Sequence, residues 1–552
     1  MAVLDLLINA FVVTRFIPFW TPICYAIIGY GCYLIYRLGL FVYNQQYLRK
    51  DIHRVNHERE KNFETAKEFV KTVPSETRKQ IRSMTYQKLK GKLHDGEITC
   101  VQVLASVVEH CLDSKILNAV TVFIPDAVRM AKEWDARASK EDFERPPLFG
   151  VPISVKESTM VKGCAQTLGF ITRIDNKAER SSIIIQKLID KGGEGALVGA
   201  KISYVGIGSD VGGSIRIPAH FCGAVGVKPG STRLSQKDCI GSLPGRPLVE
   251  AAEGPIGRTV QACVDVLSNL MDPEMSVADP YTPPLPWRED IFLHGKKNMK
   301  IGYYVSDGWF EPCPAVKNAV LKTVDCLREQ GHTLVEFTPP DVATAFRLMI
   351  GGVTVDGGSY LIDVISRDIL QSEYLQVLVP FMLPSSIRML LAHVIGFFIP
   401  RVRTLLSALP ASPSDLRQIY ADIKSYRRRF IDEMKKQDID LIVCPPNPGM
   451  AYRVGEPLRL VPTTSYTALY NMLDFPAGVV PVRFSTKEDI ENMKNYKAND
   501  IWENLFKDSM SDPKLDKIPV NVQVVGPPYS EELICFLMKS IEDKVGQYCD
   551  YA

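Results

Sequence analysis

One glycine-rich segment, residues 206–218, restricts what this chain can fold into more than any other part of its sequence. It reads Gly-Ile-Gly-Ser-Asp-Val-Gly-Gly-Ser-Ile-Arg-Ile-Pro. Two adjacent glycines allow a tight turn in which the backbone comes close to a bound molecule. A strand-like run before the turn and the Ile-Arg-Ile-Pro stretch after it would hold the turn in place. We therefore expect a strand that ends in a sharp turn carrying Ser214.

Ser214 is the candidate nucleophile of an acyl-transfer reaction. Such a nucleophile needs backbone N–H groups directed at the oxyanion that develops on the substrate. The turn itself can supply these donors, and the candidates for oxyanion and substrate binding are Val211, Gly212, Gly213 and Ser214.

Lys156 is the candidate base for this serine. It follows the apolar run 151–155, which predicts a strand that carries the lysine into the protein. Burial disfavours the ammonium form and lowers the pKa of a lysine, so a neutral lysine becomes available. In the loop, Asp210 and Arg216 can pair and brace the backbone, and Ser209 can hydrogen-bond near the nucleophile.

A histidine base has no support in the sequence. The GxSxG pattern of the α/β-hydrolase nucleophile turn is absent, and the eight histidines form no HExxH motif. The glycines near residue 193 and residue 206 approach a dinucleotide-binding fingerprint without completing G-x-G-x-x-G. Thirteen scattered cysteines without a CxxC pair indicate a reducing compartment and no structural zinc site. We expect no metal and no organic cofactor.

Short apolar runs and glycine-rich turns alternate with helical patterns from residue 148 onward, which predicts a layered α/β fold. Helices are expected over 315–330, 416–435 and 531–545, and Thr99 is the expected N-cap of an earlier helix. The expected strands are 151–155, 183–185, 205–207, 300–304, 334–337, 441–444, 477–482 and 519–525.

An uncharged stretch, residues 17–36, predicts a transmembrane helix. About 20 residues suffice to cross a ~30 Å hydrocarbon core, and the stretch contains interfacial aromatic residues such as Trp20 and Tyr36. More basic residues follow the stretch than precede it, so the positive-inside bias places the long C-terminal part in the cytoplasm. A signal peptide and a buried core helix are the alternative interpretations.

A second apolar region, residues 374–409, is divided by Pro380, Pro384 and Pro400 into pieces too short to span a bilayer. Flanking arginines favour shallow insertion into one membrane leaflet. A buried helical hairpin would produce the same pattern. The net charge, from 65 basic and 63 acidic residues, is only +2, which argues against nucleic-acid binding.

Segments 150–157 and 206–218 resemble the two ends of the amidase signature. Residues 84–97, 254–258, 465–482 and 518–523 are also similar to amidase-signature serine hydrolases, most closely to the membrane-anchored fatty acid amide hydrolases. The resemblance implies a large twisted mixed central sheet flanked by helices. It also implies hydrolysis of fatty acid amides through an acyl-serine at Ser214 with Lys156 as base, on an endomembrane such as the endoplasmic reticulum, and a homodimer.

The same resemblance implies four parts of the chain. These are an N-terminal tail (1–16), the transmembrane helix (17–36), a helical linker (37–80) and an amidase-signature domain (81–545) whose residues 374–409 form a membrane-binding cap. Lipid amides and membrane lipid are the implied partners.

The chain departs from the family between its two signature ends. The family carries a second serine there, in a Gly-Gly-Ser-Ser-Gly-Gly-like loop, which bridges the lysine and the nucleophile. Here Asp190 and Lys191 directly precede Gly192 and Gly193, and the preceding Gly-Gly-Ser-Ser is absent. A catalytically impaired splice form that acts as a membrane-bound lipid-binding or scaffold protein is therefore the alternative function.

Overall fold

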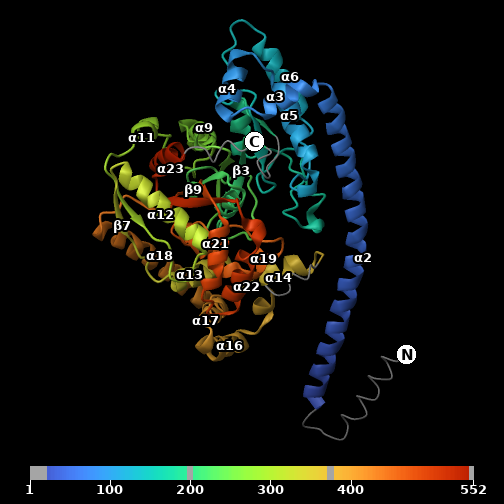
Figure 1. Ribbon diagram of the computed structural model, residues 1–552. Coiled ribbons are helices and arrows are strands. Elements are labelled where there is room, and N and C mark those ends of the chain that lie inside the picture. The colour runs from blue at the N-terminus through green and yellow to red at the C-terminus, as the bar shows by residue number, and fades with distance from the viewer. Residues whose placement is uncertain (1–20, 196–202, 370–377, 546–552) are drawn as a thin grey trace.

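Ten strands form one sheet in the described part of the computed structural model (Figure 1). The structure describes residues 21–195, 203–369 and 378–545. The strand order is β2-β1-β3-β5-β4-β9-β10-β8-β6-β7. The strands are β1 (Pro152–Val155), β2 (Glu194–Gly195), β3 (Val205–Asp210), β4 (Val225–Lys228), β5 (Ala252–Gly257), β6 (Lys300–Tyr303), β7 (Thr333–Glu336), β8 (Leu441–Cys444), β9 (Ala477–Phe484) and β10 (Pro519–Val525).

The sheet is mixed, as predicted. Strand β1 is parallel to β2 and β3 at one end, and β6 is parallel to β7 and β8 at the other. The central strands β5, β4, β9 and β10 pair antiparallel with their neighbours. Strands β8, β9 and β10 are almost entirely buried, which explains why they read as continuous apolar runs in the sequence.

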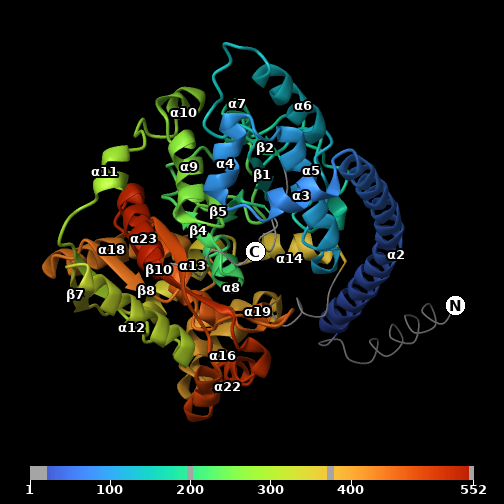
Figure 2. The same cartoon turned by 45° about the horizontal axis from the view of Figure 1, so that its top comes forward.

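Helices cover both faces of the sheet, as Figures 1 and 2 show. On one face, Met538 of α23 (Glu531–Val545) lies against Gly478 of β9. On the other face, Ala219 of α8 (Arg216–Cys222) packs against Gly226 of β4. Further helices around the sheet are α9 (Val260–Leu270), α12 (Pro314–Glu329), α13 (Val342–Val353), α18 (Pro413–Lys436) and α20 (Ser465–Met472).

The predicted strand 183–185 is wrong, because these residues begin helix α7 (Ile183–Asp190). The Ser182 side chain caps this helix by accepting a hydrogen bond from the Ile185 N–H. Ile184, Ile185 and Leu188 are buried along one helical face. Three consecutive isoleucines are typical of a strand, but the serine cap stabilises a helix at this position.

The N-terminal region is helical throughout its described part. Helix α2 (Thr21–Lys71) continues without a break at residue 36, so no structural boundary separates the predicted membrane segment from the predicted linker. Residues 17–20 lie outside the described residues. Among the described helices, none combines the length and the apolar character that crossing a bilayer requires.

Four shorter helices follow α2 and cover the β2 end of the sheet (Figure 2). Thr99 caps α5 in a reciprocal capping box with Gln102, which confirms the predicted N-cap. The helices are α3 (Ser75–Arg82), α4 (Tyr86–Asp95), α5 (Cys100–Asp113) and α6 (Ala127–Ala138).

The described part of the apolar region 374–409 contains two packed helices, α16 (Ser385–Phe398) and α17 (Pro400–Leu406), at the opposite end of the molecule from α3–α6 (Figure 1). Residues 374–377 lie outside the described residues. The hairpin is not buried: Phe397 and Phe398 are 75% and 79% exposed. Other exposed apolar side chains of this cap are Met382, Ile387, Leu390 and Val394.

Candidate active site

The glycine-rich segment forms strand β3, the turn at 211–215 and the start of α8. The carboxylate of Asp210, at the end of β3, organises this turn from within. It accepts hydrogen bonds from the N–H groups of Gly213 (2.7 Å), Ile215 (3.1 Å) and Arg216 (3.4 Å). Ser214 therefore lies at the exposed outside of a loop wrapped around a buried carboxylate.

Asp210 and Arg216 form the predicted ion pair, and neither side chain is exposed to solvent. Burial alone would raise the pKa of Asp210, but the Arg216 guanidinium and the hydrogen bonds around it hold that pKa well below its ordinary value. Arg216 also donates to Gln523 Oε1 at 2.8 Å and to the Thr467 carbonyl at 3.1 Å. The pair therefore ties the turn to β10 and α20.

Gly213 is required by geometry. Its φ is +127°, and a Cβ at this position would lie 2.3 Å from the Thr467 Oγ1 atom. Its N–H donates to Asp210, so the structure removes Gly213 from the predicted oxyanion donors. In the described part of the chain, the N–H groups of Val211, Gly212 and Ser214 make no hydrogen bond and remain the candidate donors.

Lys156 follows β1 and reaches the end of β3. Its Nζ lies 3.0 Å from Ser209 Oγ and 3.1 Å from the Ser209 carbonyl oxygen. The Ser209 hydroxyl also lies 3.1 Å from that of Ser158, a residue that the sequence did not single out. The structure thus brings two of the predicted residues, Lys156 and Ser209, into direct contact.

The lysine projects into a deep cleft, where its side chain stays accessible although protein surrounds it on several sides. This burial lowers the pKa of Lys156, while the carboxylates of Glu253 and Asp210 oppose the shift. The direction is the one that a lysine base needs, because only the neutral amine accepts a proton.

Glu253 is a buried carboxyl that the sequence analysis missed. It lies on β5 directly opposite Ser209, and its Oε2 accepts a hydrogen bond from Thr159 Oγ1 at 2.8 Å. Burial raises the pKa of Glu253 to about 7, and the Thr159 hydrogen bond and the Lys156 charge only partly oppose this. The one sequence signal was a glutamate in the otherwise uncharged run 251–257.

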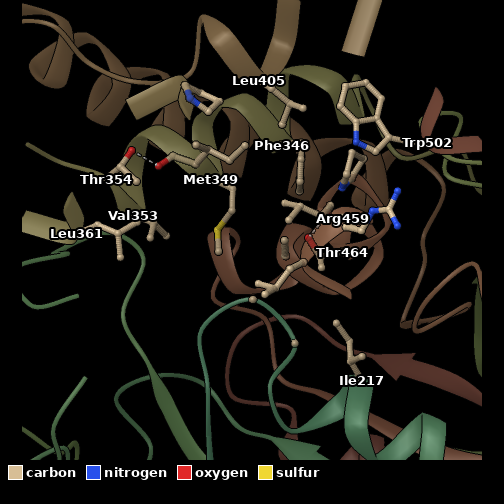
Figure 3. A pocket seen from close by; sticks show the side chains of 18 of the residues that line it. Ile217, Phe346, Met349, Val353, Thr354, Leu361, Leu405, Arg459, Thr464 and Trp502 are labelled. Atoms are coloured by element: carbon tan, nitrogen blue, oxygen red, sulfur yellow. Dashed lines mark hydrogen bonds between the residues drawn. The ribbon is translucent and has the colours of Figure 1, made fainter. Parts of the chain in front are cut away.

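Ser214 lies where two cavities meet. The first, of about 930 Å³, is largely apolar and leads from the turn to the cap helices, as Figure 3 shows for Ile217, Phe346, Met349 and Leu405. The second, of about 920 Å³, contains Lys156, Ser158, Ser209 and Glu253. In the described structure, the Ser214 hydroxyl makes no hydrogen bond with Lys156 or any other residue.

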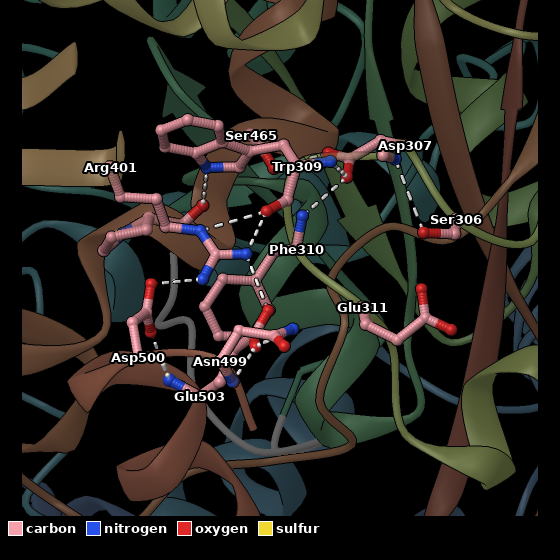
Figure 4. Close-up of polar contacts among 12 residues, drawn as sticks. Ser306, Asp307, Trp309, Phe310, Glu311, Arg401, Ser465, Asn499, Asp500 and Glu503 are labelled. Atoms are coloured by element: carbon pink, nitrogen blue, oxygen red, sulfur yellow. Dashed lines mark hydrogen bonds and ion pairs between the residues drawn. The ribbon is translucent and has the colours of Figure 1, made fainter. Parts of the chain in front are cut away.

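A half-buried arginine fixes cap helix α17 beside the apolar cavity (Figure 4). Arg401 of α17 pairs with Asp500 at 2.5 Å and with Glu503 at 2.6 Å, and it donates to the Trp309 carbonyl. Asp500 caps α22 (Ile501–Met510), whose Trp502 and Leu505 line the cavity together with Leu405 of α17. The ion pairs therefore hold two walls of the cavity together.

The predicted gap in the signature lies next to this site. Helix α7 leads through Lys191 directly to Gly192, whose φ of +87° turns the chain into the short strand β2 beside β1. No serine or threonine occurs between Ser182 and Ser203. The bridging serine expected from the resemblance therefore has no counterpart in this part of the chain.

Comparison with known proteins shows the family of this chain. A family model described as Amidase matches residues 103–193 and 191–535, two segments that meet at the gap. A fatty acid amide hydrolase 1 of Caenorhabditis elegans is 35% identical over 527 aligned positions, which cover 87% of this chain and 92% of the relative. A fatty-acid amide hydrolase 1 of Sus scrofa is 31% identical over 501 aligned positions, which cover 82% of this chain and 84% of the relative.

A solved structure described as Fatty acid amide hydrolase has the same fold, with a TM-score of 0.72 at 20% identity over 92% of this chain and 95% of that one. The family model and these relatives together identify a hydrolase that acts on amide bonds. The chain belongs to the amidase family.

Substitution of Gly213 by alanine tests the geometry of the turn. The added Cβ meets Thr467 in a backbone conformation that L-residues rarely adopt. We expect the free energy of unfolding to fall by about 2–4 kcal/mol, measured by chemical denaturation. The matched control is Gly212→Ala, where the nearest atom is Met349 Cε at 3.6 Å; its loss should stay below about 1 kcal/mol. Equal losses in the two variants would contradict the described turn.

Proposed function

We propose that this chain hydrolyses fatty acid amides, such as N-acylethanolamines and primary fatty amides, to a fatty acid and an amine. Ser214 is the nucleophile that forms an acyl-serine, and Lys156 is the base. One observation carries the proposal: Ser214 lies at the junction of a largely apolar cavity and a second cleft that contains a lysine and carboxyl groups. Such a junction suits a substrate with an apolar acyl chain and a polar amine.

The apolar cavity supports an acyl substrate. Its volume of about 930 Å³ lies in the range of roughly 300–1,000 Å³ typical of small-molecule sites. Its walls carry few polar groups, so the hydrophobic effect would drive binding of a long chain. Both relatives described above are named for fatty acid amides, in agreement with this substrate class.

The proposed chemistry uses these groups in two steps. Neutral Lys156 accepts the Ser214 hydroxyl proton as Ser214 Oγ bonds to the carbonyl carbon, and the N–H groups of Val211, Gly212 and Ser214 stabilise the oxyanion. The ammonium then protonates the leaving amine nitrogen as the C–N bond breaks, which leaves an acyl-serine. Water hydrolyses this ester by the same proton transfers in reverse order, releasing the fatty acid.

A second candidate function rests on a specific observation. The Ser214 hydroxyl makes no hydrogen bond in the described structure, and the family's bridging serine has no counterpart here. A chain without a working proton path would keep the apolar cavity and act as a membrane-bound lipid-binding or scaffold protein. Loss of general-base catalysis would lower the rate by about 10²–10⁴.

Turnover of a long-chain amide by the purified full chain separates these two functions. We expect hydrolysis of a C18 primary amide, measured as ammonia release, and its loss in Ser214→Ala to less than about 1% of the wild-type rate. Ser242→Ala removes an exposed hydroxyl from the wall of the same cleft and should leave the rate unchanged. Wild-type turnover no faster than that of Ser214→Ala would contradict the hydrolase and favour the lipid-binding protein.

We place the enzyme on an endomembrane, with a single-pass anchor at residues 17–36 and the catalytic part in the cytoplasm. The exposed apolar residues of the cap support contact with lipid, since the hairpin lies at the cavity that would receive a lipid substrate. Arg388 donates to the Leu409 carbonyl at 3.0 Å and holds α16 to the chain that follows α17. The cap would therefore present a fixed apolar surface.

Serine substitution of both Phe397 and Phe398 tests this contact. We expect hydrolysis of a long-chain amide held in phosphatidylcholine vesicles to fall about tenfold, because two phenylalanines that leave water contribute on the order of 1.5 kcal/mol or more. Hydrolysis of a soluble short-chain amide should not change. The control is Tyr281→Ser, which removes an equally exposed ring near α10 (Pro273–Ala278). Equal vesicle activity in all three proteins would contradict a lipid-facing cap.

A further inference from the structure

A hydroxyl that bridges Lys156 and Ser214 has to come from outside the Gly-Gly-Ser-Ser-Gly-Gly-like loop that this chain lacks. Residues 183–202 contain neither serine nor threonine, so no side chain in this stretch can bridge Lys156 and Ser214 through a hydroxyl. In the described structure the Ser209 hydroxyl contacts the lysine, and the Ser158 hydroxyl contacts that of Ser209.

Ser209 is the hydroxyl in direct contact with the base, at 3.0 Å from Lys156 Nζ. Side chains alternate between the two faces of a strand, and Asp210 points into the buried network with Arg216. Its neighbour Ser209 therefore faces the other way, into the cleft that contains Lys156 and Ser214. The strand thus uses consecutive residues for two purposes: one braces the turn and one faces the reacting groups.

The backbone around Ser209 keeps the two ends of the proton path together. Asp210 draws the turn back on itself through the N–H groups of Gly213 and Ile215, which keeps Ser214 near the end of β3. At the other end, Lys156 Nζ also contacts the Ser209 carbonyl oxygen at 3.1 Å. The lysine is therefore held beside β3 by a contact that does not depend on the Ser209 side chain.

Resting on the hydrolase function above, we infer that Ser209 is the bridging hydroxyl of this enzyme and that Ser158 orients it. The Ser214 hydroxyl proton passes to Ser209 Oγ while the Ser209 proton passes to the neutral amine of Lys156. Ser214 Oγ bonds to the carbonyl carbon in the same step, so Ser209 ends the step unchanged. Ser209 and Ser214 line the same cleft, and the transfer requires the exposed Ser214 side chain to meet Ser209 by rotation about χ1 or through one water molecule.

In the return transfer, the Lys156 ammonium gives its proton through Ser209 to the leaving amine nitrogen as the C–N bond breaks. The 3.1 Å contact with Ser158 gives the Ser209 hydroxyl a second partner and limits its rotation. A role in proton transfer requires only a hydroxyl at position 209, so threonine should serve in place of serine.

Ser209→Ala and Ser209→Thr, compared in the full chain, test the inference. Both the kcat/KM for a long-chain amide and the rate of Ser214 labelling by a fluorophosphonate should fall about 10²–10⁴-fold in Ser209→Ala. Ser209→Thr should recover to within about tenfold of wild type, and Ser158→Ala should lose less than Ser209→Ala. The matched control is Ser203→Ala, two residues before β3, which should leave both rates unchanged. The Ser203 hydroxyl donates to the Pro152 and Val205 carbonyls.

Each outcome has a distinct meaning. If the wild-type chain is active and the Ser209→Ala rate lies within about threefold of the wild-type rate, the bridging role of Ser209 is overturned and the hydrolase function stands. Loss in Ser209→Ala without recovery in Ser209→Thr, at unchanged thermal stability, would also overturn it. A wild-type chain that neither hydrolyses amides nor labels at Ser214 would overturn the hydrolase function, and the bridge with it.

Discussion

The buried pair of Asp210 and Arg216 is the interaction on which the site depends. Two opposite charges without solvent access are stable only when hydrogen bonds satisfy their remaining donors and acceptors. Here the acceptors of Asp210 are filled by the backbone of the turn and the donors of Arg216 by β10 and α20. The need of the buried Asp210 carboxylate for hydrogen-bond donors therefore determines the shape of the loop that carries Ser214. Truncating either partner would leave an uncompensated buried charge.

The sequence predicted the elements whose signal is local. The runs 441–444 and 519–525 became β8 and β10 with the same bounds, because buried strands read as uninterrupted apolar stretches. Residues 183–185 were predicted as a strand because three consecutive isoleucines favour a strand, whereas the Ser182 cap stabilises the helix that forms. Glu253 and Ser158 were missed because their roles arise from strand pairing and from a loop contact, and neither follows from spacing along the chain. The Asp210–Arg216 pair was predictable because both residues belong to one short segment.

The gap in the signature changes the site without removing the sheet around it. Glu194 and Gly195 occupy an edge-strand position beside β1, so Lys156 still emerges next to β3. The Lys156 side chain is accessible from the cleft although protein surrounds it, and Ser209 rather than a residue of the missing loop contacts it. On the opposite side of Ser214, the Arg401 ion pairs hold the apolar walls in place independently of the gap. Separate interactions thus maintain the apolar cavity and the cleft that contains Lys156.

The pH dependence of Ser214 labelling by a fluorophosphonate tests most directly whether Lys156 activates this serine. Burial lowers the pKa of Lys156, and only the neutral amine can accept the proton. The labelling rate should therefore rise with pH and level off below the ordinary lysine pKa of about 10.4. In Lys156→Met this rise should disappear and the rate should drop about 10²–10⁴-fold. A wild-type rate that is independent of pH, or a Lys156→Met rate equal to wild type, would contradict the account.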